Sequence, residues 1–189
     1  MKRFTAFVFM LAAAVVLVSC GGSTTLDDTE AAVYIVTEID TYNPDIDICT
    51  YLGAGTDVVI ETLRFQSNAK APGAALPSSQ DVRLLRWVIT PERNDGGDTA
   101  SPQAVYDQGV IVPAGGETTL DNYRVYPVEN LNDIPLAYLL PENGGVDPET
   151  GNRNIRQRFV LQAFGETMSG KSVATIPQSV QFNFFCGRP

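Results

Sequence analysis

Short runs of alternating apolar and polar residues, separated by turn-forming clusters, fill most of the chain after residue 31. β-Branched and aromatic residues dominate these runs, and long amphipathic helical patterns are absent. The pattern predicts strands at 32–39, 58–66, 82–90, 105–112, 123–128, 156–164 and 180–185, with weaker candidates at 46–51 and 172–176.

The segments between these strands carry turn residues. Gly, Pro, Asn and Asp are concentrated at 43–45, 94–97, 113–116 and 147–152, and they suit the backbone angles of tight turns. Many short strands with regular turns favour an antiparallel β-sandwich of immunoglobulin-like type over a parallel α/β sheet. An all-β, immunoglobulin-like fold is therefore expected for residues 32–189.

One segment has a helical pattern. Asp133 can cap a helix, Pro135 suits a first turn, and Leu136, Leu139 and Leu140 share one helical face. The pattern predicts one short helix across an end of the sandwich.

Alternation within the strands predicts the core. Trp87 is the chain's one tryptophan, and a ligand-stacking role is the alternative to a core position. Its apolar neighbours at two-residue spacing favour the core. The side chains expected in the core are Leu85, Trp87 and Ile89 on one strand, Phe159, Leu161 and Ala163 on another, and Val180, Phe182 and Phe184 on the last.

The first 19 residues have the pattern of a secretory signal peptide. Lys2 and Arg3 precede an apolar run of about 15 residues, which is shorter than the roughly 20 that cross a bilayer. The following Leu17-Val18-Ser19-Cys20 resembles the lipobox of bacterial lipoproteins. The resemblance implies that Cys20 carries lipid, with an ordinary signal peptide ending at a chance cysteine as the alternative.

A lipidated Cys20 would anchor the protein to a membrane outside the cytoplasm. More than one acyl chain gives a stable hold, because each buried CH₂ contributes about 0.8 kcal/mol. Residues 20–31 are small and polar, so they are expected to form a flexible tether. Gly21 stands where an inner-membrane retention signal often has Asp, so the outer membrane is favoured in a diderm host.

The balance of charge excludes one class of partner. Loss of residues 1–19 would leave 11 of the 13 basic side chains against 22 acidic ones, a net charge near −11. Phosphate backbones repel such a chain, so a nucleic-acid partner is not expected.

Two cysteines remain besides Cys20. Cys49 and Cys186 would meet an oxidising compartment, and two thiols allow one pairing. A disulfide between them is expected, with two unlinked buried thiols as the alternative. Neither cysteine lies in a C-x-x-C motif.

Several stretches resemble uncharacterised bacterial lipoproteins with a fibronectin III or immunoglobulin-like domain. They are 79–90 with 92–97, 159–167 and 180–184. The resemblance covers about half of the chain after the signal, and it implies fold and location only.

Candidate chemistry is limited by the absence of histidine, which removes Ser-His-Asp and Cys-His catalysis and His-ligated zinc. Oxygen-rich loops are the remaining metal candidates, and Asp147, Glu149 and Asn152 are the weak candidates for Ca²⁺. None of the loops has EF-hand spacing, so no metal and no cofactor are expected.

Two functions are compatible with these features. The first is a non-catalytic, lipid-anchored envelope protein that presents loops or an edge strand to another protein or to polysaccharide. The alternative is a small hydrolase with paired carboxylates that acts on polysaccharide, which a cleft with two acidic residues would favour.

Overall fold

The computed structural model describes residues 30–187. The predicted signal peptide, Cys20 and most of the predicted tether lie outside the described residues. Within 30–187, no helix is both long enough and apolar enough to cross a bilayer.

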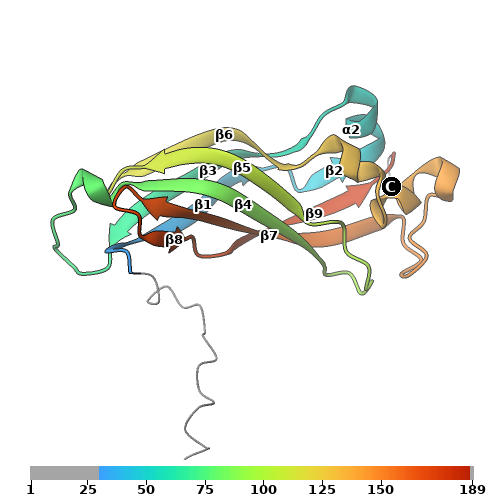
Figure 1. Cartoon of the computed structure of the whole chain (residues 1–189). Coiled ribbons are helices and arrows are strands. Elements are labelled where there is room, and N and C mark those ends of the chain that lie inside the picture. Colours follow the sequence, from blue (N-terminus) through green and yellow to red (C-terminus); the bar gives the residue numbers. More distant parts are fainter. Residues whose placement is uncertain (1–29, 188–189) are drawn as a thin grey trace, which may run out of the picture.

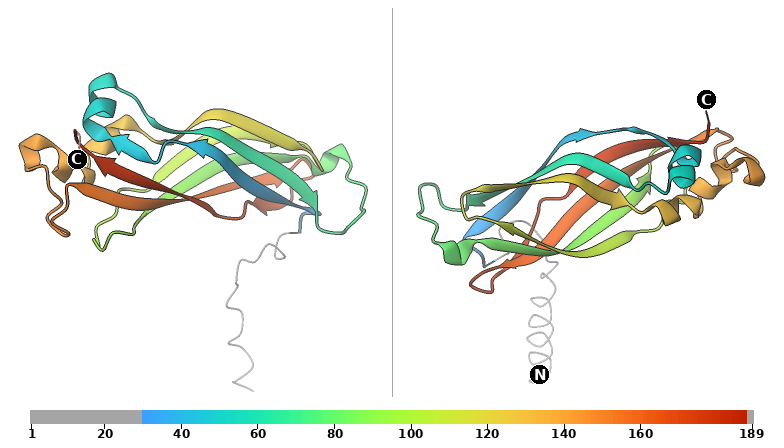
Figure 2. Two further views of the ribbon diagram at one scale, coloured as in Figure 1. Left: turned by 180° about the vertical axis from the view of Figure 1, so that it is seen from behind. Right: turned by 90° about the horizontal axis from the view of Figure 1, so that it is seen from above.

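Two β-sheets form the domain (Figures 1 and 2). The first sheet has three antiparallel strands in the order β1-β3-β6, namely β1 (Val33–Tyr42), β3 (Val58–Ala69) and β6 (Glu117–Tyr126). The second has the order β2-β9-β7-β4-β5, with β8 beside β7, and its strands are β2 (Asp45–Asp47), β9 (Gln178–Phe185), β7 (Asn154–Thr167), β4 (Val82–Arg93), β5 (Ala104–Val112) and β8 (Ser172–Ala174). Only β2 and β9 pair in parallel within this sheet.

The all-β, two-sheet prediction is confirmed, and all seven principal strands are present. The apolar faces of the two sheets meet in one buried cluster, as alternation within the strands requires. The largest shift of a strand boundary is at β6, which begins at Glu117 rather than Tyr123. Its first half is mostly polar, so its apolar pattern starts late.

Aromatic side chains fill the centre of the core. Trp87 on β4 is 3% exposed and contacts Phe65 and Tyr123, each at 5.0 Å between ring centroids. Its indole N–H donates to the Gln108 carbonyl at 2.8 Å. The prediction of a core tryptophan is confirmed, and a second aromatic group is centred on Phe159, which contacts Tyr126, Phe182 and Phe184.

The prediction that Leu85 lies in the core is wrong. Leu85 is 40% exposed and Leu84 is fully buried, because the register shifts between Leu84 and Arg86 in the pairing of β4 with both neighbours. This β-bulge breaks the period of two, so the residues on either side no longer share one parity. Opposite the bulge lies Gly165, where an added Cβ would meet the Arg83 carbonyl oxygen at 2.0 Å.

The short helix predicted near 133–140 forms as a 3₁₀ helix and not as an α-helix. Only a 3₁₀ turn, η4 (Leu136–Leu139), forms there, followed by η5 (Pro141–Asn143). Pro141 disfavours the helical conformation at Leu140, which is extended at φ −70° and ψ 140°. Leu136 and Leu139 are buried, as their shared apolar face would require.

The α-helix of the described residues lies instead at α2 (Ile48–Ala54), where a weak strand was predicted over 46–51. Asp47 caps its first turn, and Gly55 ends it in the left-handed conformation at φ 66°. Only the first part of the predicted strand forms, as β2.

The sandwich has two distinct ends (Figure 1). At the entry end, the start of β1 lies beside the end of β3, since Val33 pairs with Ala69. At the far end lie α2, three 3₁₀ turns and the end of β9. These turns are η3 (Val128–Asn132), η4 and η5. The chain therefore enters at one end, where the loop over 70–81 with the 3₁₀ helix η2 (Ser78–Gln80) also lies, and it places α2 and the other three 3₁₀ turns at the far end.

Candidate functional site

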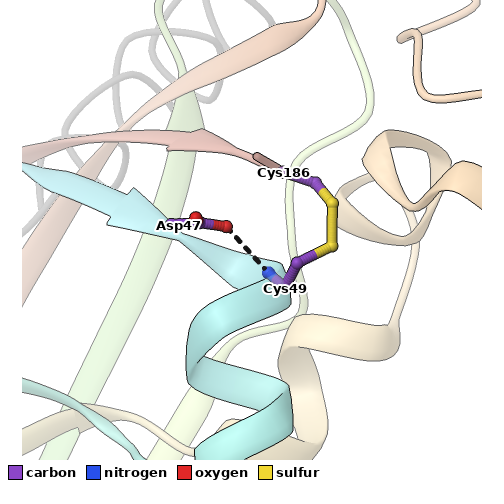
Figure 3. Close-up of side chains that lie close together, drawn as sticks. All are labelled: Asp47, Cys49 and Cys186. Carbon is purple, nitrogen blue, oxygen red and sulfur yellow. Dashed lines mark hydrogen bonds between the residues drawn. A yellow bond between two sulfur atoms is a disulfide. The ribbon is translucent and has the colours of Figure 1, made fainter. Parts of the chain in front are cut away.

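At the far end, a disulfide between Cys49 and Cys186 links α2 to the segment after β9, with the two Cα atoms 5.1 Å apart. Parallel pairing of β2 with β9 explains this contact. Asp47 lies opposite Phe185, so the next residues of both strands continue side by side into α2 and the C-terminal segment (Figure 3). The bridge fits the pairing expected from the sequence.

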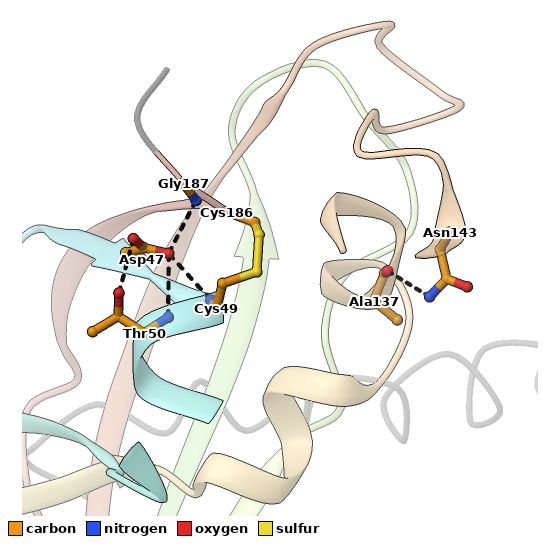
Figure 4. The surroundings of a disulfide bond; sticks show 7 residues. All are labelled: Asp47, Cys49, Thr50, Ala137, Asn143, Cys186 and Gly187. Carbon is orange, nitrogen blue, oxygen red and sulfur yellow. Dashed lines mark hydrogen bonds between the residues drawn. A yellow bond between two sulfur atoms is a disulfide. The ribbon is translucent and has the colours of Figure 1, made fainter. Parts of the chain in front are cut away.

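Asp47 ties together the two segments that carry the cysteines. Its Oδ1 accepts the backbone N–H of Cys49 at 3.1 Å, of Thr50 at 3.4 Å and of Gly187 at 3.2 Å (Figure 4). Its Oδ2 accepts the Thr50 hydroxyl at 3.0 Å. One carboxylate therefore caps α2 and holds the residue after Cys186 in place.

These hydrogen bonds determine the charge state of Asp47. Burial raises the pKa of its carboxyl group, but the donors from Gly187, Thr50 and Cys49 outweigh that effect, and the pKa is lowered. Potential metal-ligand atoms of Asp47, Cys49 and Cys186 lie within 4.8 Å of one another. The sulfurs are bonded to each other, so they offer no thiolates to a metal.

Beside the disulfide is a cleft of about 320 Å³. Its walls come from the 3₁₀ turns, from the loop before β7 and from the end of β9, and they include Leu139, Pro141, Gly144, Arg153, Phe185 and Gly187. The turn segment is held by hydrogen bonds from Asn143 Nδ2 to the Ala137 carbonyl at 2.8 Å and from the Gly145 N–H to the Leu140 carbonyl at 3.1 Å (Figure 4). One wall of the cleft is thus preformed.

A buried ion cluster joins two loops at the same end. Arg93, the last residue of β4, has a side chain that is 2% exposed, and it contacts Asp95 and Asp147 at 2.7 Å each. Those carboxylates are 3% and 0% exposed. Glu149 lies 3.7 Å from the same guanidinium and also accepts the backbone N–H of Asp98 at 2.7 Å.

The hydrogen bonds and ion pairs of the cluster favour the charged forms of the Asp95 and Asp147 carboxyl groups. Burial raises the pKa of Asp147, but hydrogen bonds from Thr150, Arg93 and the Glu149 N–H outweigh it and lower the pKa. Asp95 is affected in the same way, with donors that include Arg93 and the Arg156 N–H. A Cβ at Gly97 would lie 2.3 Å from Nη2 of Arg93, so glycine makes room for the guanidinium.

The same contacts show where the three weak candidates for Ca²⁺ lie. Asp147 and Glu149 come together, but around a guanidinium rather than around an open position for a cation. Asn152 is exposed on the same loop, where its carbonyl accepts the Asp147 N–H at 2.8 Å. The three residues therefore form a loop held by Arg93, which was not among the candidate residues.

A second cleft, of about 350 Å³, lies on the outer face of the larger sheet. It contains Asp107 and Glu166 beside the exposed Leu85 and Phe164. Both carboxylates are ion-paired, Asp107 with Arg86 at 3.0 Å and Glu166 with Arg83 at 2.7 Å. Cross-strand pairing accounts for these contacts, since the partners lie on neighbouring strands.

Two features of the far end were missed from the sequence. The spacing of Asp47 and Gly55, a cap residue and a glycine eight positions apart, is a signal that could have identified α2. The cluster around Arg93 has no comparable signal, because Asp95 and Asp147 come from loops far apart in the sequence.

No family model matches this sequence, and no curated protein matches it. Among solved structures, a crystal structure of a protein from Archaeoglobus fulgidus is similar over 82% of this chain and 95% of its own, with 12% identity and a TM-score of 0.33. A superposition at that level carries no argument about fold or function.

Proposed function

We propose that this chain is a non-catalytic, lipid-anchored binding protein of the bacterial cell envelope, with an immunoglobulin-like domain that is attached through Cys20. The observation that carries the proposal is the separation of the two ends. Residues nearest the proposed anchor lie at the entry end, and the disulfide, the 3₁₀ turns and the 320 Å³ cleft lie at the far end.

Strand order supports the immunoglobulin-like part of the proposal. Of the seven principal strands, the first, second and fifth (β1, β3 and β6) form one sheet. The seventh, sixth, third and fourth (β9, β7, β4 and β5) form the other in that order. This arrangement matches a fibronectin III-like sandwich, in which the fourth strand lies beside the third.

Core packing supports the same assignment. Trp87 lies on the third principal strand and packs against Phe65 of the second. Immunoglobulin domains place a core tryptophan on this strand, against a disulfide between the second and sixth strands. Here Phe65 and Ala163, which pairs with Trp87, take the places that a bridge would occupy.

The titratable groups support a non-catalytic role. Glycoside hydrolysis needs a carboxyl group that keeps its proton near neutral pH, which requires a raised pKa. Five carboxyl groups of the described residues have pKa values that depart from the ordinary ones, and all five are lowered: Glu30, Asp47, Asp95, Asp147 and Glu149. The cleft that contains Asp107 and Glu166 is the observation that would favour a hydrolase, but both carboxylates are paired with arginines, Asp107 with Arg86 and Glu166 with Arg83.

Photo-crosslinking in the native envelope tests the proposal. A crosslinkable residue replaces the exposed Glu142 on η5 at the far end, and the matched control replaces the exposed Ala74 in the loop after β3 at the entry end. The expected result is a discrete adduct, with a protein or with polysaccharide, from position 142 and none of the same mass from position 74. Adducts only from position 74 would contradict a far-end binding surface.

A further inference from the structure

Among residues 30–187, Arg153 is an exposed cation at the far end whose guanidinium has no partner. Most arginines of the described residues form ion pairs, including Arg64, Arg83, Arg86, Arg93 and Arg158. Within residues 30–187, the guanidinium groups of Arg153 and Arg156, which lie three positions apart, form no hydrogen bond or ion pair, although the Arg156 backbone N–H donates to Asp95 at 2.8 Å. A chain with an acidic excess therefore leaves two cations free in one small region.

The two free arginines differ in their surroundings. Arg153 is the charged residue among those lining the 320 Å³ cleft, whereas Arg156 points outward from β7. The volume is near the lower end of the range for small-ligand sites. Phe185 lines the same cleft and is partly exposed, so the cleft offers an aromatic surface as well as a guanidinium.

On this basis we infer that the cleft binds the carboxylate of an acidic saccharide, a uronate unit, through Arg153. This inference rests on the proposed binding function and names the class of ligand for it. The planar guanidinium can donate two parallel hydrogen bonds to a carboxylate. The ring of Phe185 offers an apolar surface to the C–H groups of a sugar.

Two acidic groups at this end, Asp47 and Asp147, are directed to partners other than Arg153. Asp47 is directed to three backbone N–H groups, and Asp147 is directed to Arg93. The bridge between Cys49 and Cys186 and the hydrogen bonds of the turn segment hold two walls of the cleft before a ligand arrives. A preformed site loses less freedom on binding, which favours affinity for a small group.

Calorimetric titration of the full chain in detergent tests the inference. The probes are a hexamer of galacturonate, a neutral hexamer of glucose and a hexamer of glutamate. The variants are Arg153→Gln and the matched control Arg156→Gln, which removes the other free arginine. Because neither side chain has a partner in the part of the chain that the structure describes, both variants are expected to keep the melting temperature of the wild type.

The expected result is binding of hexagalacturonate that weakens about tenfold or more in Arg153→Gln and by less than about twofold in Arg156→Gln. The neutral hexamer should not bind detectably. An equal loss of affinity in both variants would mean that binding depends only on the overall positive charge of this region, and it would overturn the inference. Equal affinity for hexaglutamate would assign the cleft to acidic peptides and overturn it as well.

Absence of hexagalacturonate binding would also overturn this inference. That outcome is distinguishable from failure of the proposed function, because the crosslinking experiment reports any partner of the far end, whatever its chemistry.

Discussion

Arg93 is a buried cation whose position depends on acidic residues from two loops. Its side chain is 2% exposed and lies between carboxylates that are equally buried. Taking such charges out of water has a large free-energy cost, which close pairing and further hydrogen bonds offset. The cluster therefore contributes most by fixing the 94–98 and 147–150 loops relative to each other, with Gly97 leaving the space that the guanidinium needs.

Replacement of this cation should destabilise the domain. The variant Arg93→Met leaves Asp95 and Asp147 buried without their cation, so the free energy of unfolding should fall by about 3–5 kcal/mol. The matched control is Arg83→Met, whose ion pair with Glu166 is exposed and should contribute about 0–1 kcal/mol. Urea unfolding of both variants measures the difference, and equal losses would contradict the account of the cluster.

The same cluster predicts how stability depends on pH. The folded-state pKa values of Asp95 and Asp147 are lowered from the unfolded value of about 3.9. Their contribution is therefore fully present above that value and is lost as the pH falls through the folded pKa values. Melting temperatures between pH 7 and pH 2 should fall steeply below about pH 4 in the wild type.

The variant Asp147→Asn provides the comparison for this profile. It should be less stable than the wild type at neutral pH, because Arg93 loses a buried partner. It should also lose less stability on acidification, since one of the two titrating groups is gone. Parallel profiles for the two proteins would show that Asp147 does not titrate with folding.

At the scale of elements, local sequence identifies strands well and their irregularities poorly. The alternation over 156–164 and 180–185 predicts β7 and β9 and their buried residues, because each strand has one face in the core. The bulge at Leu85 depends on a close approach of Gly165, which lies on another strand. No pattern within β4 carries that information.

The sequence at the start of α2 is compatible with both a strand and a helix. Ile46 and Ile48 alternate with Asp47 and so resemble a strand, but Asp47 also caps a helix. Two residues of that alternation do pair with β9, and the chain then turns into the helix. The disulfide that follows fixes this junction to the end of β9.

The disulfide predicts a measurable stabilisation. The double variant Cys49→Ala/Cys186→Ala should unfold with a free energy lower by about 2–5 kcal/mol. The control is the wild type under reducing conditions, which should show a loss of similar size. Thiol labelling of denatured, unreduced wild type should leave both cysteines unmodified, and label on the peptides that contain them would contradict the bridge.

At the scale of the whole molecule, the sequence predicts more of the architecture than of the site. Strand periodicity and turn residues predict two packed sheets, and the expected core residues other than Leu85 are buried. The site at the far end is assembled from β2, β9, the 3₁₀ turns and two loops, which meet only after the sheets have formed. Arg153 could not be singled out beforehand, because a free arginine is recognised only when the partners of the others are known.

We expect lipid on Cys20 to hold the domain to a membrane, with its far end directed outward. Metabolic labelling with radioactive palmitate, on wild type and on Cys20→Ala, tests this attachment. Label is expected in the wild type and not in the variant, and the wild-type protein is expected in the membrane fraction. A wild type without label, or a Cys20→Ala variant that is labelled equally, would contradict it.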